Sequence, residues 1–555
     1  MKILLVTEKC SQSQTERDGG ARLVETLQNS FADSLSIMQF GPKAEKTAKW
    51  HFDYPCNHAS RFERRLENAS FIAKQIKLVE HHFTHVIFVH ISMQFGIANM
   101  PLHENIQIWT FPMFLTPSYR ASGEIVPERY FEAEMQALLS AKNIVTPSHM
   151  EKRQLVEVYS VLEEKIHVVP RGIQTHFLKP KIRTLNGPPK FCSVGSIKPQ
   201  KNTLGLIHLF AKAAAIYPGA TLQVIGPLQN IEYFTKVQAE IDRLKISEFV
   251  EFNGYIPPTQ LSKAIEKTHL HLSTSTCETF GRSIFETLAL GLPNIARKSE
   301  NASAEFLEHL PYARFIDDDR KALEAIEYML SHLSKLSSMA TEIGSLYDDK
   351  ILSRLLVSKF ARSNPIVISD FDGTLYHKND LERTLRCLNA FQKFPLKVLC
   401  SARPIHDLIE KLKYYELKVD WIIGSSGAIC TDGGGKLIWL KPLDPGVVSD
   451  IERQVREARR IEFEGQVLQI AVPVESMSSI LGLRSEIYQD TMFISHWEAS
   501  KLRAVHRLLN YINWDGQVRI FGDGPYDIEL LNYFDGTLIT PNPINKLQKK
   551  EIEYV

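Results

Sequence analysis

The sequence has few cysteines, no long apolar run and no excess of charge of either sign. Its seven cysteines are scattered over 555 residues, and no two have the spacing of a zinc ribbon or a disulfide framework. No apolar run approaches the roughly 18 residues that a membrane-spanning helix needs, and the amino terminus lacks a signal-peptide core. The 65 basic and 64 acidic residues almost cancel, so we expect no nucleic-acid partner. Together these absences predict a reduced, cytoplasmic protein.

What the sequence does contain is the pattern of several α/β domains. At roughly 150 residues per domain, the length predicts three or four of them. Short, continuously apolar runs such as Ile3–Val6 and Val86–His90 alternate with helix-length segments such as Arg61–Glu80. Strands that are apolar on both faces, each followed by a helix, are typical of parallel sheets covered by helices on both sides.

Two changes in this pattern indicate domain boundaries. A stretch rich in proline, glycine and lysine covers 178–189, and the strand–helix pattern restarts just after it. Residues 320–360 contain helical patterns without strands, and a new strand begins after Asn364-Pro365. The predicted divisions are a first α/β domain at 1–177, a second at 178–335, a helical connection at 336–363 and a third α/β domain at 364–555.

The strongest motif, Asp370-Phe-Asp372-Gly-Thr374, directly follows the apolar strand Ile366–Ile368. Two carboxylates at the carboxyl end of such a strand converge on the crevice where open α/β sheets bind ligands. One carboxylate can attack phosphorus while the other handles the proton of the leaving oxygen. So much negative charge in one place requires a hard cation, and Mg²⁺ prefers oxygen ligands of this kind.

Three further motifs follow in order. Ser401 ends the run LKVLCS, Lys501 comes a hundred residues later, and Asp523 and Asp527 follow the run VRIF. A hydroxyl and an ammonium group can hold phosphate oxygens, and a carboxylate can complete a metal site. Over about 365–555 this set resembles the haloacid dehalogenase superfamily, whose signature is D-x-D-x-T, Ser or Thr, Lys, and G-D-x-x-x-D.

The resemblance implies a role for each of these residues. Asp370 would be the nucleophile that forms an aspartyl-phosphate, and Asp372 the general acid/base. Ser401 and Lys501 would bind phosphate. The implied Mg²⁺ residues are Asp370, Asp372, Asp523 and Asp527, the last orienting the lysine or the metal.

The long interval between Ser401 and Lys501 predicts an inserted cap at about 432–497. Its entry, Ser425-Ser-Gly427-Ala428, is similar to that of the sugar-phosphatase branch. An alternative is a degenerate phosphatase module that is retained for stability.

A second constellation lies at 273–296, where Glu278 and Glu286 flank Phe280-Gly281. If Glu278 ends a loop and Glu286 lies two turns into a helix, both face one ligand. Carboxylates accept hydrogen bonds from vicinal hydroxyls, and backbone amides near Gly281 form a helix amino terminus suited to phosphate.

The runs that precede this pair are FCSVGSIKPQKN at 191–202, LQVIGP at 222–227 and VEFNGYIPPTQL at 250–261. With the glutamates they resemble the donor half of retaining GT-B glycosyltransferases of family 4, which include sucrose-phosphate synthases. The resemblance extends over about 1–335. It implies two Rossmann-like domains in a GT-B arrangement, followed by a haloacid dehalogenase-type domain with an α+β cap.

The resemblance assigns Lys201 to the donor diphosphate, Glu286 to the ribose and Glu278 to the transferred sugar. The glycine loop Gly19-Gly20 would face the donor phosphates, and Phe280 and Gly281 would complete the donor site. His90, at the end of a strand in the first domain, would contact the transferred sugar, or it is a hydrogen-bonded core histidine.

One residue departs from the family pattern. The family has an arginine where Ser196 stands. Lys198 could replace the lost guanidinium as a point charge, and Arg171 is another candidate, although a solvated loop residue is an equally good interpretation.

The combined resemblance implies a bifunctional enzyme. A UDP-, GDP- or ADP-sugar would donate to a sugar or sugar-phosphate acceptor with retention of configuration and without a metal, and a Mg²⁺-dependent phosphatase would remove the phosphate. Two alternatives remain: a capsule or cell-wall glycosyltransferase with an uncoupled phosphatase, and a glycosyltransferase regulated by a sugar-phosphate-sensing third domain. A peripheral membrane contact also remains open.

Overall fold

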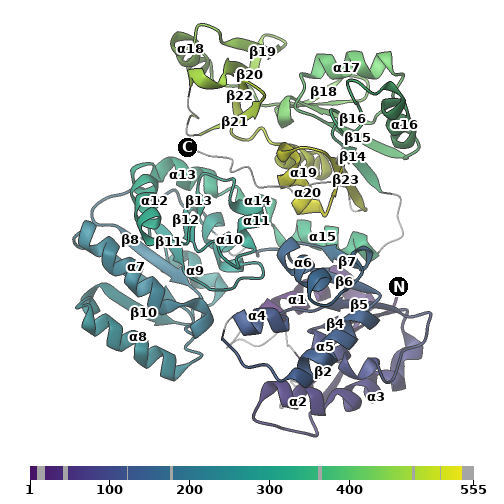
Figure 1. Ribbon diagram of the computed structural model, residues 1–555, viewed down its shortest axis with the longest axis vertical. Helices are drawn as coiled ribbons and strands as arrows, with labels where there is room; N and C mark the ends of the chain where they lie inside the picture. Colours follow the sequence, from purple (N-terminus) through teal and green to yellow (C-terminus); the bar gives the residue numbers. More distant parts are fainter. Residues whose placement is uncertain are drawn as a thin grey trace. The chain divides into compact units, whose positions relative to one another are not determined.

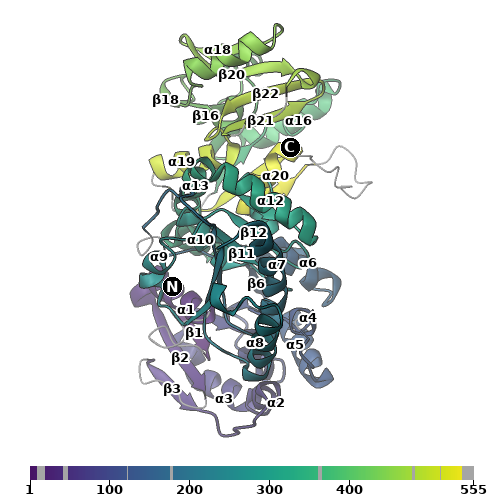
Figure 2. The same cartoon turned by 90° about the vertical axis from the view of Figure 1, so that its left-hand side faces the viewer.

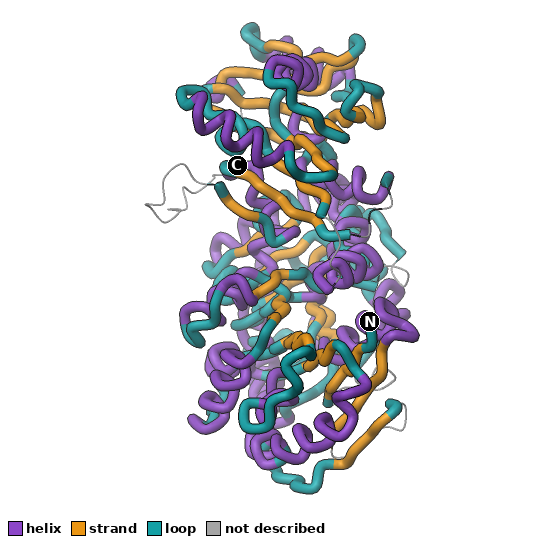
Figure 3. Tube along the Cα trace, turned by 90° about the vertical axis from the view of Figure 1, so that its right-hand side faces the viewer, coloured by secondary structure: helices purple, strands orange, loops and turns teal. Residues whose placement is uncertain are grey.

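The computed structural model describes residues 1–8, 19–41, 48–121, 123–174, 179–360, 365–477, 480, 482–512, 514 and 516–539. The chain forms two compact units, Met1–Ser353 and Arg354–Val555. Each of them contains both helices and strands (Figure 3). No helix within the described ranges is both long and apolar enough to cross a membrane.

The first unit begins with a parallel sheet that has seven strands within the described residues, in the order β3-β2-β1-β4-β5-β6-β7 (Figure 1). Its central strands are buried on both faces, as their continuous apolar sequences predict. The strands are β1 (Ile3–Thr7), β2 (Leu35–Gly41), β3 (Trp50–Asp53), β4 (His85–Val89), β5 (Gln107–Phe111), β6 (Asn143–Thr146) and β7 (Ile166–Val168). The helices are α1 (Gly19–Phe31), α2 (Arg61–Glu67), α3 (Ala69–Val79), α4 (Thr116–Ala121), α5 (Glu128–Ser140) and α6 (His149–Glu157).

A second parallel sheet follows in the same unit, with the described order β10-β9-β8-β11-β12-β13. Figure 2 shows α7 alongside α8 and α12, which it also contacts. The strands are β8 (Lys190–Val194), β9 (Thr221–Ile225), β10 (Val250–Gly254), β11 (Leu270–Ser273), β12 (Asn294–Ala296) and β13 (Ala313–Phe315). The helices are α7 (Thr203–Ile216), α8 (Ile231–Arg243), α9 (Pro258–Ala264), α10 (Arg282–Ala289), α11 (Ser303–Leu307) and α12 (Asp319–Ser331). The predicted α/β class with parallel sheets is confirmed for this unit.

The predicted helical connection does more than join domains. It contains the end of α13 (Leu333–Ala340) and all of α14 (Ile343–Leu346) and α15 (Asp349–Phe360). The amide of Asp349, the first residue of α15, donates to the carbonyl of Ile173 in the first domain at 3.0 Å. The Thr26 hydroxyl on α1 donates to the Asp349 carboxylate at 3.0 Å. The chain therefore returns to the first domain before it enters the second unit.

The second unit contains a sheet with the described order β18-β17-β16-β15-β14-β23-β24. It is parallel except where β16, β17 and β18 pair in antiparallel fashion. The strands are β14 (Ile366–Ser369), β15 (Leu396–Cys400), β16 (Trp421–Gly424), β17 (Ile429–Asp432), β18 (Leu437–Leu440), β23 (Val518–Gly522) and β24 (Thr537–Leu538). The helices are α16 (Leu381–Gln392), α17 (Ile405–Tyr414), α19 (Lys501–Tyr511) and α20 (Ile528–Phe534).

Between β18 and α19 lies the inserted sheet, which is antiparallel in the order β19-β20-β22-β21. Its apolar face packs against α18 (Pro445–Gln454) through Val448 and Ile451 (Figure 2). The strands are β19 (Arg459–Phe463), β20 (Gln466–Pro473), β21 (Leu483–Tyr488) and β22 (Thr491–His496).

The insertion begins later than the predicted residue 432. The turn at Asp432–Gly435, where Gly435 has a φ of +91°, folds β18 back onto β17 and so into the main sheet. A short apolar strand looks the same in sequence whichever sheet it joins, which is why the sequence placed β18 in the cap.

A buried carboxyl group in the first domain gives a testable pH dependence. Glu151, in the first turn of α6, is fully buried, and neither carboxyl oxygen has a hydrogen-bond partner within the described residues. Burial raises its pKa from 4.5 to about 8, opposed by the charge of Arg171 and assisted by that of Glu134. The folded state therefore holds a proton that the unfolded state releases.

Because the folded-state pKa is raised, we expect the unfolding free energy of the first unit to fall as pH rises from 4.5 to about 8. The contribution of Glu151 approaches about 1.4 kcal/mol per pH unit. Glu151→Gln should remove this contribution, which urea unfolding at a series of pH values measures. The exposed Glu164→Gln is the matched control, and an unchanged slope in Glu151→Gln would contradict the prediction.

Candidate active sites

The first candidate site lies at the carboxyl ends of three adjacent strands in the second unit. β14 pairs in parallel with β15 on one side and with β23 on the other. Asp370, Ser401 and Asp523 each directly follow one of these strands. Because parallel strands end at the same edge of a sheet, residues 370, 401 and 523 are brought together there.

Lys501, the first residue of α19, connects two of the carboxylates. Its Nζ atom lies 2.9 Å from Asp370 Oδ1 and 2.7 Å from Asp527 Oδ1. The other oxygen of Asp527 accepts the amide protons of Asp523 and Gly524, each at 3.2 Å. Asp527 therefore fixes both the lysine and the loop that carries Asp523.

These buried charges shift one another's pKa values. Burial, opposed by the charge of Lys501, raises the pKa of Asp370 to about 7. Burial lowers the pKa of Lys501, but the charges of Asp370 and Asp527 outweigh it and leave that pKa above its ordinary value. Lys501 is thus held as an ammonium group beside the predicted nucleophile.

Three carboxylates of this site fit a divalent cation. Ligand oxygens of Asp370, Asp523 and Asp527 lie within 4.8 Å of one another, and an all-oxygen donor set suits Mg²⁺. The Asp523 carboxylate lies so close to Gly373 that a Cβ atom there would approach Asp523 Oδ2 to 1.7 Å. Gly373, with a φ of +76°, is therefore required both by its backbone conformation and by this carboxylate.

Asp372 is outside this group of carboxylates. Its two oxygens accept from Arg403 Nε at 2.5 Å and Arg403 Nη2 at 2.7 Å. A carboxylate held in this bidentate way is an acceptor, so it can give a proton to a leaving group only after it exchanges this partner. The sequence did not single out Arg403, although it stands two residues after Ser401.

The inserted sheet reaches the loop beside Ser401. The Ser426 amide donates to the Ser401 carbonyl at 3.1 Å, and the Ser426 hydroxyl donates to Glu486 on β21. Arg484, also on β21, donates to Glu486 at 2.9 Å. Ser425 and Ser426 both have left-handed backbones, with φ values of 48° and 55°, so the loop is strained where the insertion contacts it.

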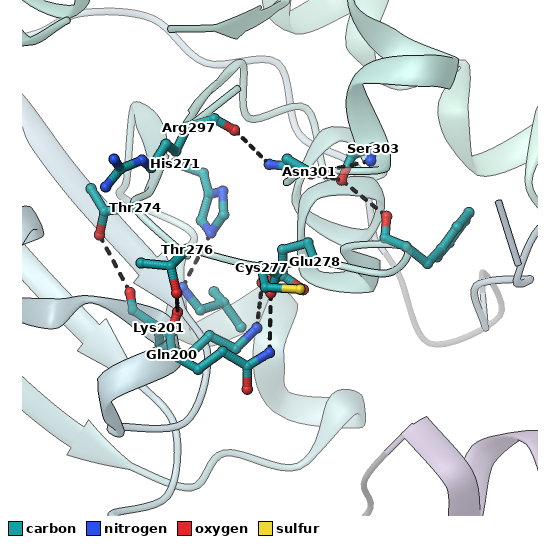
Figure 4. Close-up of polar contacts among 12 residues, drawn as sticks. Gln200, Lys201, His271, Thr274, Thr276, Cys277, Glu278, Arg297, Asn301 and Ser303 are labelled. Carbon is teal, nitrogen blue, oxygen red and sulfur yellow. Dashed lines mark hydrogen bonds and ion pairs between the residues drawn. The ribbon is translucent and has the colours of Figure 1, made fainter. Parts of the chain in front are cut away.

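The second candidate site lies in the first unit, around Glu278. Lys201, in the loop after β8, forms an ion pair with the Glu278 carboxylate (Figure 4). The Gln200 side chain donates to the Cys277 carbonyl at 3.0 Å, and the Thr276 amide donates to the Gln200 carbonyl at 2.9 Å. These bonds join the loops that follow β8 and β11, and they bring Lys201 to Glu278.

The residues after Glu278 position α10. Gly281 has a φ of +76°, and a Cβ atom there would lie 2.2 Å from Ser303 Oγ, so only glycine fits. Phe280 is buried and stacks on Phe285, with ring centroids 4.3 Å apart. Phe280 therefore packs in the core beneath the loop, and Glu286 follows on the helix.

Glu286 has a partner that the sequence did not reveal. Arg22 of α1, in the first domain, forms an ion pair with it. The structure places Gly19 and Gly20 in the first turn of α1, not in the loop that the sequence suggested. Arg22 lies in the same turn, so the start of α1 delivers a guanidinium group to the second domain. No local sequence signal distinguished this arginine from a surface residue.

The remaining predicted donor residues are placed as follows. Lys198 precedes Lys201 in the loop after β8, and its pKa is lowered, first by burial and then by the charge of Lys201. His90 is buried at the end of β4, where its φ of 82° indicates strain. Its ring contacts Ser92 and Tyr119 of its own domain, which satisfies the core interpretation and leaves its role toward a sugar a prediction.

Comparison with known proteins identifies the middle of the chain. Residues 175–342 match the family described as "Glycosyl transferases group 1". The D-inositol 3-phosphate glycosyltransferase of Nocardia farcinica is 32% identical over 178 residues, or 29% of this chain and 39% of that protein. A probable sucrose-phosphate synthase of Thermosipho melanesiensis is 26% identical over 227 residues, or 38% of this chain and 53% of that protein. The chain thus spans about two fifths to one half of the length of these curated relatives.

Solved structures extend the likeness in fold to both domains of the first unit. Sucrose-phosphate synthase from Thermosynechococcus elongatus superposes with a TM-score of 0.55 at 15% identity, covering 65% of this chain and 98% of that one. Anabaena Alr3699/HepE in complex with UDP-glucose gives 0.52 at 14% identity, covering 65% and 99%. The first unit therefore has the α/β GT-B fold of glycosyltransferases, and the family match contains Lys201, Glu278 and Glu286.

The carboxylate group of the second unit predicts a cation site that can be measured directly. We expect Mg²⁺ to bind the full-length, EDTA-treated protein, and Asp523→Asn to weaken that binding at least about tenfold, since one of three ligand carboxylates is neutralised. Titration calorimetry with magnesium chloride measures both proteins. Asp450→Asn, which changes an exposed carboxylate on α18, is the control. Equal Mg²⁺ binding by Asp523→Asn and wild type would place the cation elsewhere.

Proposed function

We propose that the chain is a bifunctional enzyme: the first unit transfers a sugar from a nucleotide-sugar to an acceptor, and the second hydrolyses a phosphomonoester. The observation that carries the transferase is a pair of ion pairs, Lys201 with Glu278 and Arg22 with Glu286, in which both carboxylates belong to the segment that matches glycosyl transferases group 1. The Anabaena neighbour is described in complex with UDP-glucose. This supports a UDP-sugar as the donor to test first.

The transfer step requires little covalent chemistry from the protein. The bond between the anomeric carbon and the diphosphate breaks, and the acceptor oxygen bonds to the same face of that carbon while its proton passes to an oxygen of the departing diphosphate. Lys201 and Lys198 offer positive charge where the diphosphate leaves. Glu286 accepts from the ribose hydroxyls and Glu278 from the sugar, each after exchanging its present cationic partner.

The proposed hydrolysis begins with an oxygen of Asp370 attacking phosphorus. The bond from phosphorus to the leaving oxygen breaks as Asp372 supplies its proton, and water then releases phosphate from the aspartyl-phosphate. Lys501 and Ser401 hold the phosphate oxygens. Mg²⁺, bound by Asp370, Asp523 and Asp527, would supply charge neutralisation when present.

The inserted sheet supports a sugar phosphate as the substrate of this second reaction. Glu486 and Arg484, on β21, bring a buried acceptor and a half-buried donor to the loop beside Ser401. Polar groups of both kinds suit a leaving group rich in hydroxyls, which both donate and accept.

The two activities together suggest a relay in which the transferase acts on a sugar phosphate and the phosphatase removes the phosphate. We expect Asp370→Asn, given a UDP-sugar, a panel of sugar phosphates and Mg²⁺, to accumulate a phosphorylated glycoside. Wild type should release the same glycoside without phosphate. Mass spectrometry of the products identifies both substrates at once.

Glu286→Gln is the matched control, since it should abolish glycoside formation and leave hydrolysis of a chromogenic phosphate ester intact. Identical glycosylated products from Asp370→Asn and wild type would establish two uncoupled activities. A second unit that binds sugar phosphates without hydrolysing them would favour the regulatory sensor.

A further inference from the structure

The family resemblance leads us to expect an arginine at position 196, where this chain has Ser196. The first unit therefore lacks one guanidinium group in this loop. Lys198 and Lys201 remain in the same loop, but Lys201 is already paired with Glu278. An ammonium group is also a point charge, whereas a guanidinium binds two phosphate oxygens at once. The structure must therefore supply this binding from elsewhere, or the donor site is weaker than those of its relatives.

Arg22 is the first candidate to replace it. Its side chain is 15% exposed and paired with Glu286 of the other domain. Its Nε atom is buried and has no hydrogen-bond partner within the described residues. A buried N–H group without an acceptor is unfavourable, so Arg22 has unused capacity to donate beside the predicted ribose-binding carboxylate.

Arg282 is the second candidate. It is the first residue of α10, immediately after the left-handed Gly281, and lies one helical turn before Glu286 on the same face. Among the described parts of the chain, its guanidinium has no hydrogen bond or ion pair. Burial, assisted by the nearby charge of Arg22, lowers its pKa to about 10.

Arg22 and Arg282, both half-buried, thus lie close to each other and to the Glu286 carboxylate, and Asp349 is also close to Arg282. Like charges at the same place repel each other, and desolvated cations without full pairing are costly. An anion with several oxygens would remove both penalties. The amides at the start of α10, beside Arg282, also favour negative charge.

We propose that Arg22 and Arg282 together hold the diphosphate of the nucleotide-sugar donor and so replace the arginine that the family has at position 196. We call these two arginines the diphosphate clamp. On donor binding, Arg22 exchanges Glu286 for the diphosphate, and the freed Glu286 accepts from the ribose hydroxyls. The inference rests on the proposed glycosyl transfer. It makes the first domain, through α1, a contributor to leaving-group stabilisation.

Titration calorimetry on the full-length protein tests the diphosphate clamp. It measures the affinities for UDP, GDP and ADP and compares each with the affinity for the parent nucleoside. Arg22→Gln and Arg282→Gln should each lower affinity for the preferred nucleoside diphosphate about ten- to a hundredfold. Affinity for the nucleoside should change by less than about twofold, since the arginines contact only the phosphates. Arg320→Gln, which removes an exposed guanidinium from α12, is the control of equal charge.

The exchange is tested with inorganic pyrophosphate, which has no ribose. In Glu286→Gln no ion pair has to be broken, so pyrophosphate should bind more tightly than to wild type, and the added change Arg22→Gln should abolish that gain. Equal pyrophosphate affinity in wild type and Glu286→Gln would overturn the exchange.

Other outcomes separate the clamp from the function on which it rests. Equal losses for nucleoside and nucleoside diphosphate, or no loss, would overturn the clamp. If Arg22→Gln and Arg282→Gln lose binding of glucose 6-phosphate but bind nucleoside diphosphates as wild type does, the two arginines belong to the acceptor site. That result would also overturn the clamp. A wild-type protein that binds none of the three nucleoside diphosphates would refute the proposed glycosyl transfer itself.

Discussion

Both candidate sites depend on the convergence of parallel strands at one edge of a sheet. In the second unit it brings residues 370, 401 and 523 together from three neighbouring strands, although more than 120 residues separate the second from the third. In the first unit it places the loops after β8 and β11 side by side, so that Lys201 meets Glu278. The strands themselves are apolar and interchangeable, whereas the residue that follows each one determines the chemistry.

Three cations of these sites are each paired with a carboxylate of the same site. Lys201 is paired with Glu278, Arg22 with Glu286 and Arg403 with Asp372. Such pairs keep half-buried charges from being left unsatisfied, which is the costly alternative. They also mean that a ligand binds by exchange. A phosphate must offer the cation at least what the carboxylate offered, while the released carboxylate must find hydroxyl groups on the same ligand. A molecule that has both phosphate and sugar hydroxyls satisfies both conditions at once, and inorganic phosphate does not.

The sequence was sufficient for the α/β class, the parallel sheets of the first unit and the order of the chemical motifs. These features depend on local patterns, namely continuous apolar strands and the polar residues that end them. It was not sufficient for partners that come from distant segments. Arg22 and Glu286 are 264 residues apart, and Arg403 reaches Asp372 across 31 residues. Either arginine alone is indistinguishable in sequence from a solvated surface residue.

The sequence also left open whether an aromatic side chain faces the site or packs in the core. Phe280 stands between two predicted donor residues, yet its ring packs on Phe285 and Phe306. Its contribution is therefore to hold Gly281 and the start of α10 in place. Likewise, the sequence placed β18 in the cap, but β18 pairs with β17, because the turn before it decides which sheet it joins.

The proposed transferase and phosphatase also benefit differently from being part of one chain. Transfer to a sugar phosphate is reversible, because the nucleoside diphosphate can take the glycosyl group back from the phosphorylated product. Hydrolysis removes the phosphate that the transferase would need in order to bind the product again. Covalent linkage raises the effective concentration of the second unit near newly released product without any added contact. This advantage matters most when the intermediate binds weakly.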